Sequence, residues 1–112
     1  MIQTAQNVAE RFGVGREELD RYAQRSQERA VAAQAAGFFA REIVPVPLPG
    51  RAPLEHDECP RASSTLEKLA ALEPVSGPDG VITAGNACPL NDGAAAVLVM
   101  SAEAARRHGL RP

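Results

Sequence analysis

The stretch TAGNACPLNDGAAAVLVMS, residues 83–101, places Cys88 among small residues just before an Asn-Asp-Gly turn. A continuous run of small and apolar residues, 94–100, follows the turn, and this pattern predicts a β-strand covered on both faces. Ser101 then suits the start of a short helix over residues 102–108, which Gly109 ends. The cysteine in this setting raises the question of whether it is a catalytic nucleophile.

The part of the chain before this stretch is expected to be mainly helical. Thr4 is predicted to cap a first helix whose apolar residues end at Phe12, and a longer helix is predicted over residues 16–36. The longer helix carries a narrow stripe of small and apolar residues, which are Leu19, Tyr22, Ala23, Ser26, Ala30 and Ala33. We interpret this stripe as a packing face, with a partner-binding surface as the alternative.

The middle of the chain alternates extended and turn signals. The prolines of EIVPVPLP, residues 42–49, lack N–H donors and restrict this segment to a sheet edge or an isolated extended run. A loop is expected over residues 50–63, and Ser64 and Glu67 have the spacing of a capping box for a third helix that Pro74 limits. A covered strand needs neighbours, and this chain offers it one weak extended segment, so the sequence reads like part of a larger fold.

Composition and charge narrow the function classes. The 112 residues are 45% hydrophobic and 4% aromatic, and their net charge of −2 is interspersed along the chain, so neither nucleic acid nor an anionic membrane is an expected partner. No apolar run approaches the ~20 residues of a membrane helix. Cys59 and Cys88 lack a paired spacing and no secretory pattern opens the chain, so a cytoplasmic location with reduced thiols is expected.

Consecutive blocks of the sequence, among them MIQTAQNVAERF, TLEKLAALEPV and TAGNACPLNDGAAAVLVMS, resemble the thiolases, the acetyl-CoA acyltransferases. The resemblance covers essentially the whole chain and implies an α/β fold class. It implies a fragment of the thiolase fold, mainly a helical portion of the loop domain plus one buried strand and a following helix. Residues 1–90 match the CoA-binding side of the loop domain, and residues 91–112 match the last strand of the N-terminal domain and the start of the link to the C-terminal domain.

The function that the resemblance implies is acyl transfer between CoA thioesters through a cysteine acyl-enzyme. The reaction is thiolysis of a 3-ketoacyl-CoA or Claisen condensation of an acyl-CoA, with CoA or acyl-CoA as substrate and without a metal or a bound cofactor. Full-length members of the family form homodimers or homotetramers. Because Met1 matches an internal methionine of the family, the chain is expected to be an incomplete reading of a gene or a truncated remnant.

No catalytic residue and no metal ligand is predicted in this chain. The family nucleophile lies in Cys-x-Ser-Gly and the family histidine in Gly-His-Pro, whereas the cysteines here lie in ECPRAS and ACPLND and the histidines in EHD and RHG. The second family cysteine in Cys-x-Gly-Gly and the oxyanion-hole motif Asn-Glu-Ala-Phe do not occur either. The cluster EHDEC, residues 55–59, is interpreted as a solvated turn because adjacent residues rarely point at one ion.

The resemblance does assign substrate-binding positions. Arg61, which from the sequence alone is a solvated loop arginine, matches a family arginine at the adenine and phosphate end of CoA, and Met1 matches a methionine at the mouth of the acyl pocket. The residues that match the nucleotide and pantetheine path are Lys68, Leu69, Val75, Ala84, Ala87 and Cys88. Family members commonly have a serine at the position of Cys88. For Cys88 itself, plain packing and a nucleophilic role are the alternatives to a contact with CoA. Ser76 replaces an aromatic residue that often packs on adenine, which weakens the expected nucleotide grip.

Three functions are compatible with the same residues. The chain is either a fragment of a thiolase or a stand-alone CoA-binding or helical interaction module without catalysis. A small thiol enzyme that uses Cys88 is the third possibility, and it lacks a neighbouring group in the sequence that would lower the thiol pKa.

Overall fold

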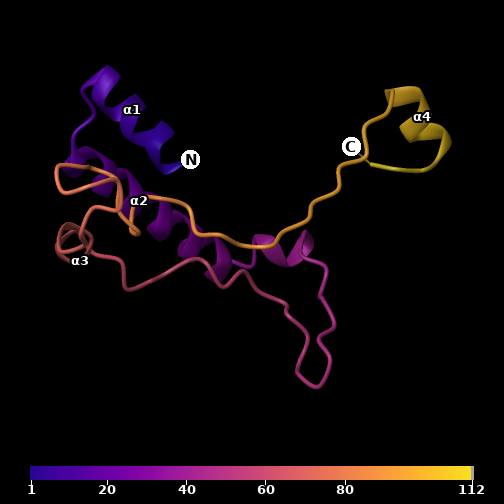
Figure 1. The fold of residues 1–112 in the computed structure, drawn as a ribbon. Coiled ribbons are helices and arrows are strands. Elements are labelled where there is room, and N and C mark those ends of the chain that lie inside the picture. Colours follow the sequence, from indigo (N-terminus) through magenta and orange to yellow (C-terminus); the bar gives the residue numbers. More distant parts are fainter. Residues whose placement is uncertain (112) are drawn as a thin grey trace.

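The computed structural model describes residues 1–111. In chain order these residues form α1 (Ile2–Phe12), α2 (Arg16–Ala35), the 3-10 helix η1 (Phe39–Arg41), α3 (Leu66–Ala70) and α4 (Ala102–Arg107). Figure 1 shows α1, α2 and α3 gathered at one end of the molecule and α4 at the other end. The radius of gyration is 18.8 Å, whereas a compact domain of similar length has about 13 Å. The chain therefore consists of a packed region and an extended region.

The first two helices match the sequence pattern except at one end. α1 begins at Ile2 with Met1 as its N-cap, and the N–H of Ala5 donates to the carbonyl oxygen of Met1 at 3.0 Å. The prediction that Thr4 caps this helix is therefore wrong, because the backbone is already helical before it. Gly13 ends α1 with a φ of 66°, a left-handed conformation that suits glycine. The longer helix is confirmed, since α2 spans Arg16–Ala35.

The stripe predicted on α2 is only partly a packing face. Tyr22 is 66% exposed and Ser26 is also exposed. Tyr22 lies under the guanidinium of Arg25, which is 5.2 Å from the centroid of its ring, rather than in a core. The half-buried members of the stripe are Leu19, Ala23, Ala30 and Ala33. The helix also packs against α3.

The third helix is capped one residue later than predicted. Thr65, not Ser64, is the N-cap of α3, and its side chain accepts a hydrogen bond from the N–H of Lys68 at 3.3 Å. Hydrogen bonds from the backbone N–H of Glu67 and from the side chain of Thr65 lower the pKa of the Glu67 carboxyl. This carboxylate at the start of α3 also suits the positive end of the helix dipole.

Two isolated antiparallel bridges link the segments around α3. Val46 and Leu54 exchange both backbone hydrogen bonds, at 3.0 and 2.9 Å, which confirms a short extended run near the prolines. Pro74 pairs with Thr83 across the turn at residues 77–80. This second bridge brings the end of α3 back to the start of the stretch at residues 83–101.

Residues 94–100 do not form the covered strand that their sequence predicts. Neither bridge described for residues 1–111 includes this run, and Val97 is 85% exposed. A strand needs a hydrogen-bonded neighbour, and the described part of the chain places none beside this segment. In Figure 1 it runs as a single extended path from the packed region to α4. α4 itself confirms the last predicted helix, with Ser101 accepting from the N–H of Ala104 at 3.1 Å and the helix ending at Arg107.

The buried interior is small and partly polar. The buried apolar residues are Ala9, Leu69, Ile82 and Ala105, and the buried polar residues are Gln6, Asp20 and Thr83. Across residues 1–111, every buried side-chain nitrogen and oxygen has a hydrogen-bond partner. No helix in the described part of the chain is both long and apolar enough to cross a membrane. The packed region therefore depends on paired polar groups as well as on apolar contacts.

Candidate functional site

A groove of about 360 Å³ opens between α2, α3 and two loops. One loop covers residues 58–64, and the other covers residues 84–91. The lining residues are Gln27, Glu58, Cys59, Arg61, Ser63, Ser64, Lys68, Leu69, Leu72, Ala84, Gly85, Ala87, Pro89 and Asn91. The groove thus combines segments that are far apart in the sequence.

The groove collects most of the positions that the resemblance assigns to CoA. The residues brought together there are Arg61, Lys68, Leu69, Ala84 and Ala87. Met1 is exposed and lines a separate hollow beside α1. Val75 and Cys88 are exposed and are not among the lining residues of the groove. The roles assigned to all these residues stay predictions, as do the domain limits at residues 1–90 and 91–112.

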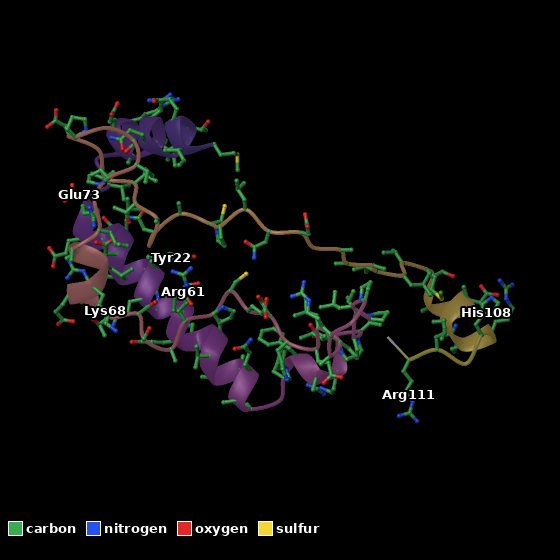
Figure 2. The ribbon with its side chains drawn as sticks, turned by 60° about the horizontal axis from the view of Figure 1, so that its bottom comes forward. Tyr22, Arg61, Lys68, Glu73, His108 and Arg111 are labelled. Atoms are coloured by element: carbon green, nitrogen blue, oxygen red, sulfur yellow. The ribbon has the colours of Figure 1, made fainter. Side chains whose placement is uncertain are left out.

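The groove is lined by two cationic side chains, Arg61 and Lys68, and by one carboxylate, that of Glu58. Figure 2 shows Arg61 and Lys68 beside α2 and α3, at the opposite end of the molecule from His108. The N–H of Arg61 donates to Oε1 of Gln27 at 2.7 Å, and Nζ of Lys68 donates to the carbonyl oxygen of Ser63 at 2.9 Å. The bond to Gln27 uses only the backbone of Arg61. Its guanidinium forms no ion pair among the described residues, so it can meet an anionic or aromatic ligand.

Gly85 allows the loop to approach α3 closely. A Cβ at this position would lie 2.5 Å from Cδ2 of Leu69 and 2.6 Å from Cδ1 of Leu72, which is closer than side chains can pack. The neighbouring Ala84 and Ala87 carry only a methyl group. This wall of the groove is therefore built from small residues against two leucine side chains.

A buried carboxylate holds the same loop in place. Asp20 is 3% exposed, and its Oδ1 accepts a hydrogen bond from Nδ2 of Asn86 at 3.0 Å. Oδ1 of Asn86 in turn accepts from the N–H of Thr83 at 2.8 Å. The second carboxylate oxygen of Asp20 accepts from Nε of Arg16 at 2.8 Å. The loop at residues 83–87 is thus tied to α2 by fully paired buried groups.

Arg16 extends this network to α3. Its Nη2 donates to the carbonyl oxygens of Leu69 at 2.6 Å and Leu72 at 2.9 Å. These carbonyls lie at the end of α3, where helices leave backbone oxygens without an internal partner. A cation at this end also suits the helix dipole. Arg16 and Asp20 together fix both α3 and the 83–87 loop relative to α2.

The two thiols differ in their surroundings. Asp57, hydrogen-bonded to Cys59, raises the pKa of the Cys59 thiol, and burial adds to this shift. A raised pKa keeps more of the thiol protonated at neutral pH and makes it a poor nucleophile. Cys88 is exposed, and both cysteines are free. In residues 1–111 no three His, Cys, Asp or Glu side chains lie close enough to hold a metal ion.

Sequence reasoning missed several lining residues, and Gln27 and Cys59 are the most informative. Gln27 lies outside the stripe predicted on its helix, yet it lines the groove and its side chain accepts a hydrogen bond from the N–H of Arg61. It follows Asp20 by two helical turns, and this spacing places both residues on one face of α2. That spacing was the available signal. Cys59 carries no local pattern that would have placed it in the groove.

Comparison with known proteins gives the class. A family model described as "Thiolase, N-terminal domain" matches residues 1–103. The chain is 56% identical over 115 aligned residues to the beta-ketoadipyl-CoA thiolase of Pseudomonas aeruginosa, covering all of this chain and 29% of that protein. It is 52% identical over 111 residues to an acetyl-CoA acetyltransferase of the same bacterium, covering 96% of this chain and 28% of the relative.

Solved structures give the same class. The acetyl-CoA acetyltransferase of Bacillus anthracis superposes with a TM-score of 0.92 at 44% identity, over all of this chain and 29% of that one. The human mitochondrial 3-ketoacyl-CoA thiolase, solved in complex with CoA, gives a TM-score of 0.87 at 42% identity, over 97% of this chain and 27% of that one. The chain belongs to the thiolase family, and its fold is a fragment of the α/β thiolase fold. It spans about 29% of the length of the beta-ketoadipyl-CoA thiolase it matches.

Proposed function

We propose that this chain is the CoA-binding part of a thiolase, an enzyme that transfers acyl groups between CoA thioesters. The observation that carries the proposal is the groove in which Arg61 and Lys68 lie together with the small residues Ala84 and Ala87. The structural relative solved in complex with CoA supports the choice of ligand.

The chemistry of the groove fits the two parts of CoA. The nucleotide end carries phosphates and a purine, and a guanidinium such as that of Arg61 can pair with phosphate and stack on an aromatic ring. The ammonium group of Lys68 adds a second positive charge to the groove. The pantetheine arm is thin and carries no net charge, and it suits the narrow wall formed by Ala84, Gly85 and Ala87.

In the proposed enzyme a cysteine thiolate takes the acyl group from a 3-ketoacyl-CoA, whose carbon–carbon bond breaks to release acetyl-CoA, or from an acyl-CoA, whose thioester bond breaks to release CoA. Free CoA then accepts that group in thiolysis, or a second acyl-CoA accepts it in condensation. The step requires a thiolate, a base and hydrogen-bond donors for the thioester oxygen. The family motifs that hold these groups do not occur in this sequence. We therefore assign the chemical step to other parts of a complete thiolase and CoA binding to this chain.

We also propose that the complete enzyme is a homodimer or homotetramer that acts in the cytoplasm. The free thiols of Cys59 and Cys88 fit a reducing compartment. Sedimentation of the complete enzyme and its cell fractionation would test these two points.

A chimeric enzyme tests the proposed function. In this chimera the chain replaces the matching stretch of the beta-ketoadipyl-CoA thiolase of P. aeruginosa, to which it is 56% identical. The chimera is expected to retain thiolysis of a 3-ketoacyl-CoA with saturation by CoA. The matched variant with Arg61→Ala and Lys68→Ala is expected to need more CoA for the same rate. A chimera that assembles like its parent but shows no CoA-dependent thiolysis contradicts the proposal.

The isolated chain tests the alternative of a stand-alone module. It is expected to show no thiolysis of acetoacetyl-CoA above background, because each missing catalytic group normally contributes orders of magnitude. Titration calorimetry is expected to give millimolar or weaker CoA binding, roughly −4 kcal/mol. Micromolar binding by the isolated chain would favour a stand-alone CoA-binding module.

A further inference from the structure

One face of α2 carries polar side chains that each bind a different segment of the chain. Asp20, Gln27 and Gln34 follow one another at intervals of two helical turns, so they lie along one side of the helix. Asp20 accepts from Asn86, Gln27 accepts from the N–H of Arg61, and Gln34 donates to the carbonyl oxygen of Asp57. The helix thus acts as a support to which these segments are attached.

The middle contact of this series lies inside the groove. Gln27 and Arg61 both line it, and the bond between Oε1 of Gln27 and the Arg61 N–H is 2.7 Å long. The two residues are 34 positions apart in sequence, so this bond connects the loop directly to α2. Arg61 belongs to neither a helix nor one of the two bridges. Its carbonyl oxygen accepts a local hydrogen bond from the N–H of Ser64 at 3.2 Å, so among the described contacts the bond to Gln27 is the one that fixes its backbone to α2.

We infer that Gln27 is a positioning residue for CoA: its side-chain oxygen holds the Arg61 backbone so that the guanidinium faces the groove. This inference rests on the proposed function of the groove. A loop held before the ligand arrives does not have to be ordered during binding, which increases affinity without a contact to the ligand. Because CoA is held equally in the ground and transition states, loss of this support changes the KM for CoA and leaves kcat unchanged.

The chain offers a matched control on the same helix. Gln34 also bonds through its side chain to the backbone of another segment, donating to the carbonyl oxygen of Asp57 at 2.8 Å, but it does not line the groove. In the chimeric enzyme, Gln27→Ala is expected to raise the KM for CoA roughly two- to tenfold, the range of one neutral hydrogen bond. Gln34→Ala is expected to leave it unchanged.

A double-mutant cycle shows whether Gln27 acts through Arg61. If it does, Gln27→Ala combined with Arg61→Ala has the KM of Arg61→Ala alone, because the positioned side chain is already gone. Additive effects of the two substitutions overturn the inference, as does an equal effect of Gln34→Ala. If Arg61→Ala alone leaves the KM unchanged, the proposed CoA site and this inference both fail. If Arg61→Ala raises the KM and Gln27→Ala does not, only the positioning role fails.

Hydrogen exchange gives a readout that does not depend on activity. The amide of Arg61 is expected to exchange faster in Gln27→Ala than in the unsubstituted protein, whereas the amide of Leu69, bonded within α3 to Thr65, keeps its rate. An unchanged exchange rate at Arg61 overturns the inference. Faster exchange at both amides also overturns it, since that result indicates general loss of structure.

Discussion

The packed region around α1, α2 and α3 and the extended region from residue 92 to residue 111 are stabilised in different ways. In the packed region buried polar groups find partners inside the chain, as Asp20 does with Arg16 and Asn86. In the extended region the apolar residues at 97–99 are exposed, and no bridge includes them. The first region is defined by specific hydrogen bonds, and the second carries apolar surface that nothing in the described chain covers.

The difference shows which interactions a short chain can complete by itself. A hydrogen bond needs one partner with correct geometry, and α2 provides several such partners along one face. Hydrophobic burial needs an area that encloses the side chain, and a strand covered on both faces needs neighbouring strands and helices. The groove proposed to bind CoA belongs to the first region, so its geometry is present although the strand is not formed.

The largest effect is expected from a substitution of Val97, a residue of the extended region. In the chimeric enzyme Val97→Asp is expected to destabilise the fold by about 3 kcal/mol or more, because the covered strand would bury an unpaired charge. In the isolated chain, where Val97 is 85% exposed, the same change is expected to leave the helical circular dichroism unchanged and to reduce aggregation.

Val44→Asp is the matched control for Val97→Asp. Val44 is 80% exposed and precedes a proline in the segment that suits a sheet edge. Its replacement is expected to have little effect in either protein. If Val97→Asp is as harmless as Val44→Asp in the chimera, residues 94–100 are not a covered strand of the family fold.

A smaller effect is expected at Gly85, within the packed region. Gly85→Ala places a methyl group against Leu69 and Leu72 and is expected to lower the stability of the isolated chain by about 1–3 kcal/mol. Gly93→Ala is the control in the extended region, because nothing lies within 4 Å of the added carbon. Urea unfolding followed by circular dichroism measures both variants. Equal midpoints for the two variants would contradict the close packing at Gly85.

The smallest effect concerns the rates at which the thiols react. At pH 8 iodoacetamide is expected to alkylate exposed Cys88 faster than half-buried Cys59, because the nearby Asp57 raises the pKa of Cys59 and lowers its thiolate fraction. The alkylation rate of Cys59 is expected to keep rising with pH beyond the pH at which the rate of an ordinary thiol levels off. Asp57→Asn is expected to increase the alkylation rate of Cys59 and to leave that of Cys88 unchanged. Mass spectrometry of timed samples measures both rates, and equal rates would argue against the described surroundings of Cys59.

The sequence predicted the elements whose signals are local. Helix α2 has regular spacing along its whole length, and the Ser101 cap and the Gly109 stop of α4 each lie within two residues of an end of that helix. The resemblance added the groove positions Arg61 and Lys68. The strand predicted at residues 94–100 requires other elements that cover its two faces. The described residues do not provide such elements.

The support of the groove could not be predicted in the same way. The bonds from Asn86 to Asp20 and from Arg61 to Gln27 join residues 66 and 34 positions apart. A polar residue on a helix is usually solvated, so its type alone does not indicate a distant partner. The N-cap of α3 was misplaced because Ser64 and Thr65 are both good capping residues, and only the backbone geometry shows that Thr65 accepts the bond from Lys68.

The most direct test of the central claim, that this chain holds CoA through its groove, is the steady-state kinetics of Arg61→Ala in the chimeric enzyme. The account predicts an apparent KM for CoA that rises about three- to tenfold, since Arg61 is exposed and an exposed charge contributes modestly. It predicts a kcat that stays nearly constant, because the nucleotide is bound equally in the ground and transition states. An unchanged KM, or a kcat that falls while the KM stays constant, would contradict the assignment of this groove to CoA.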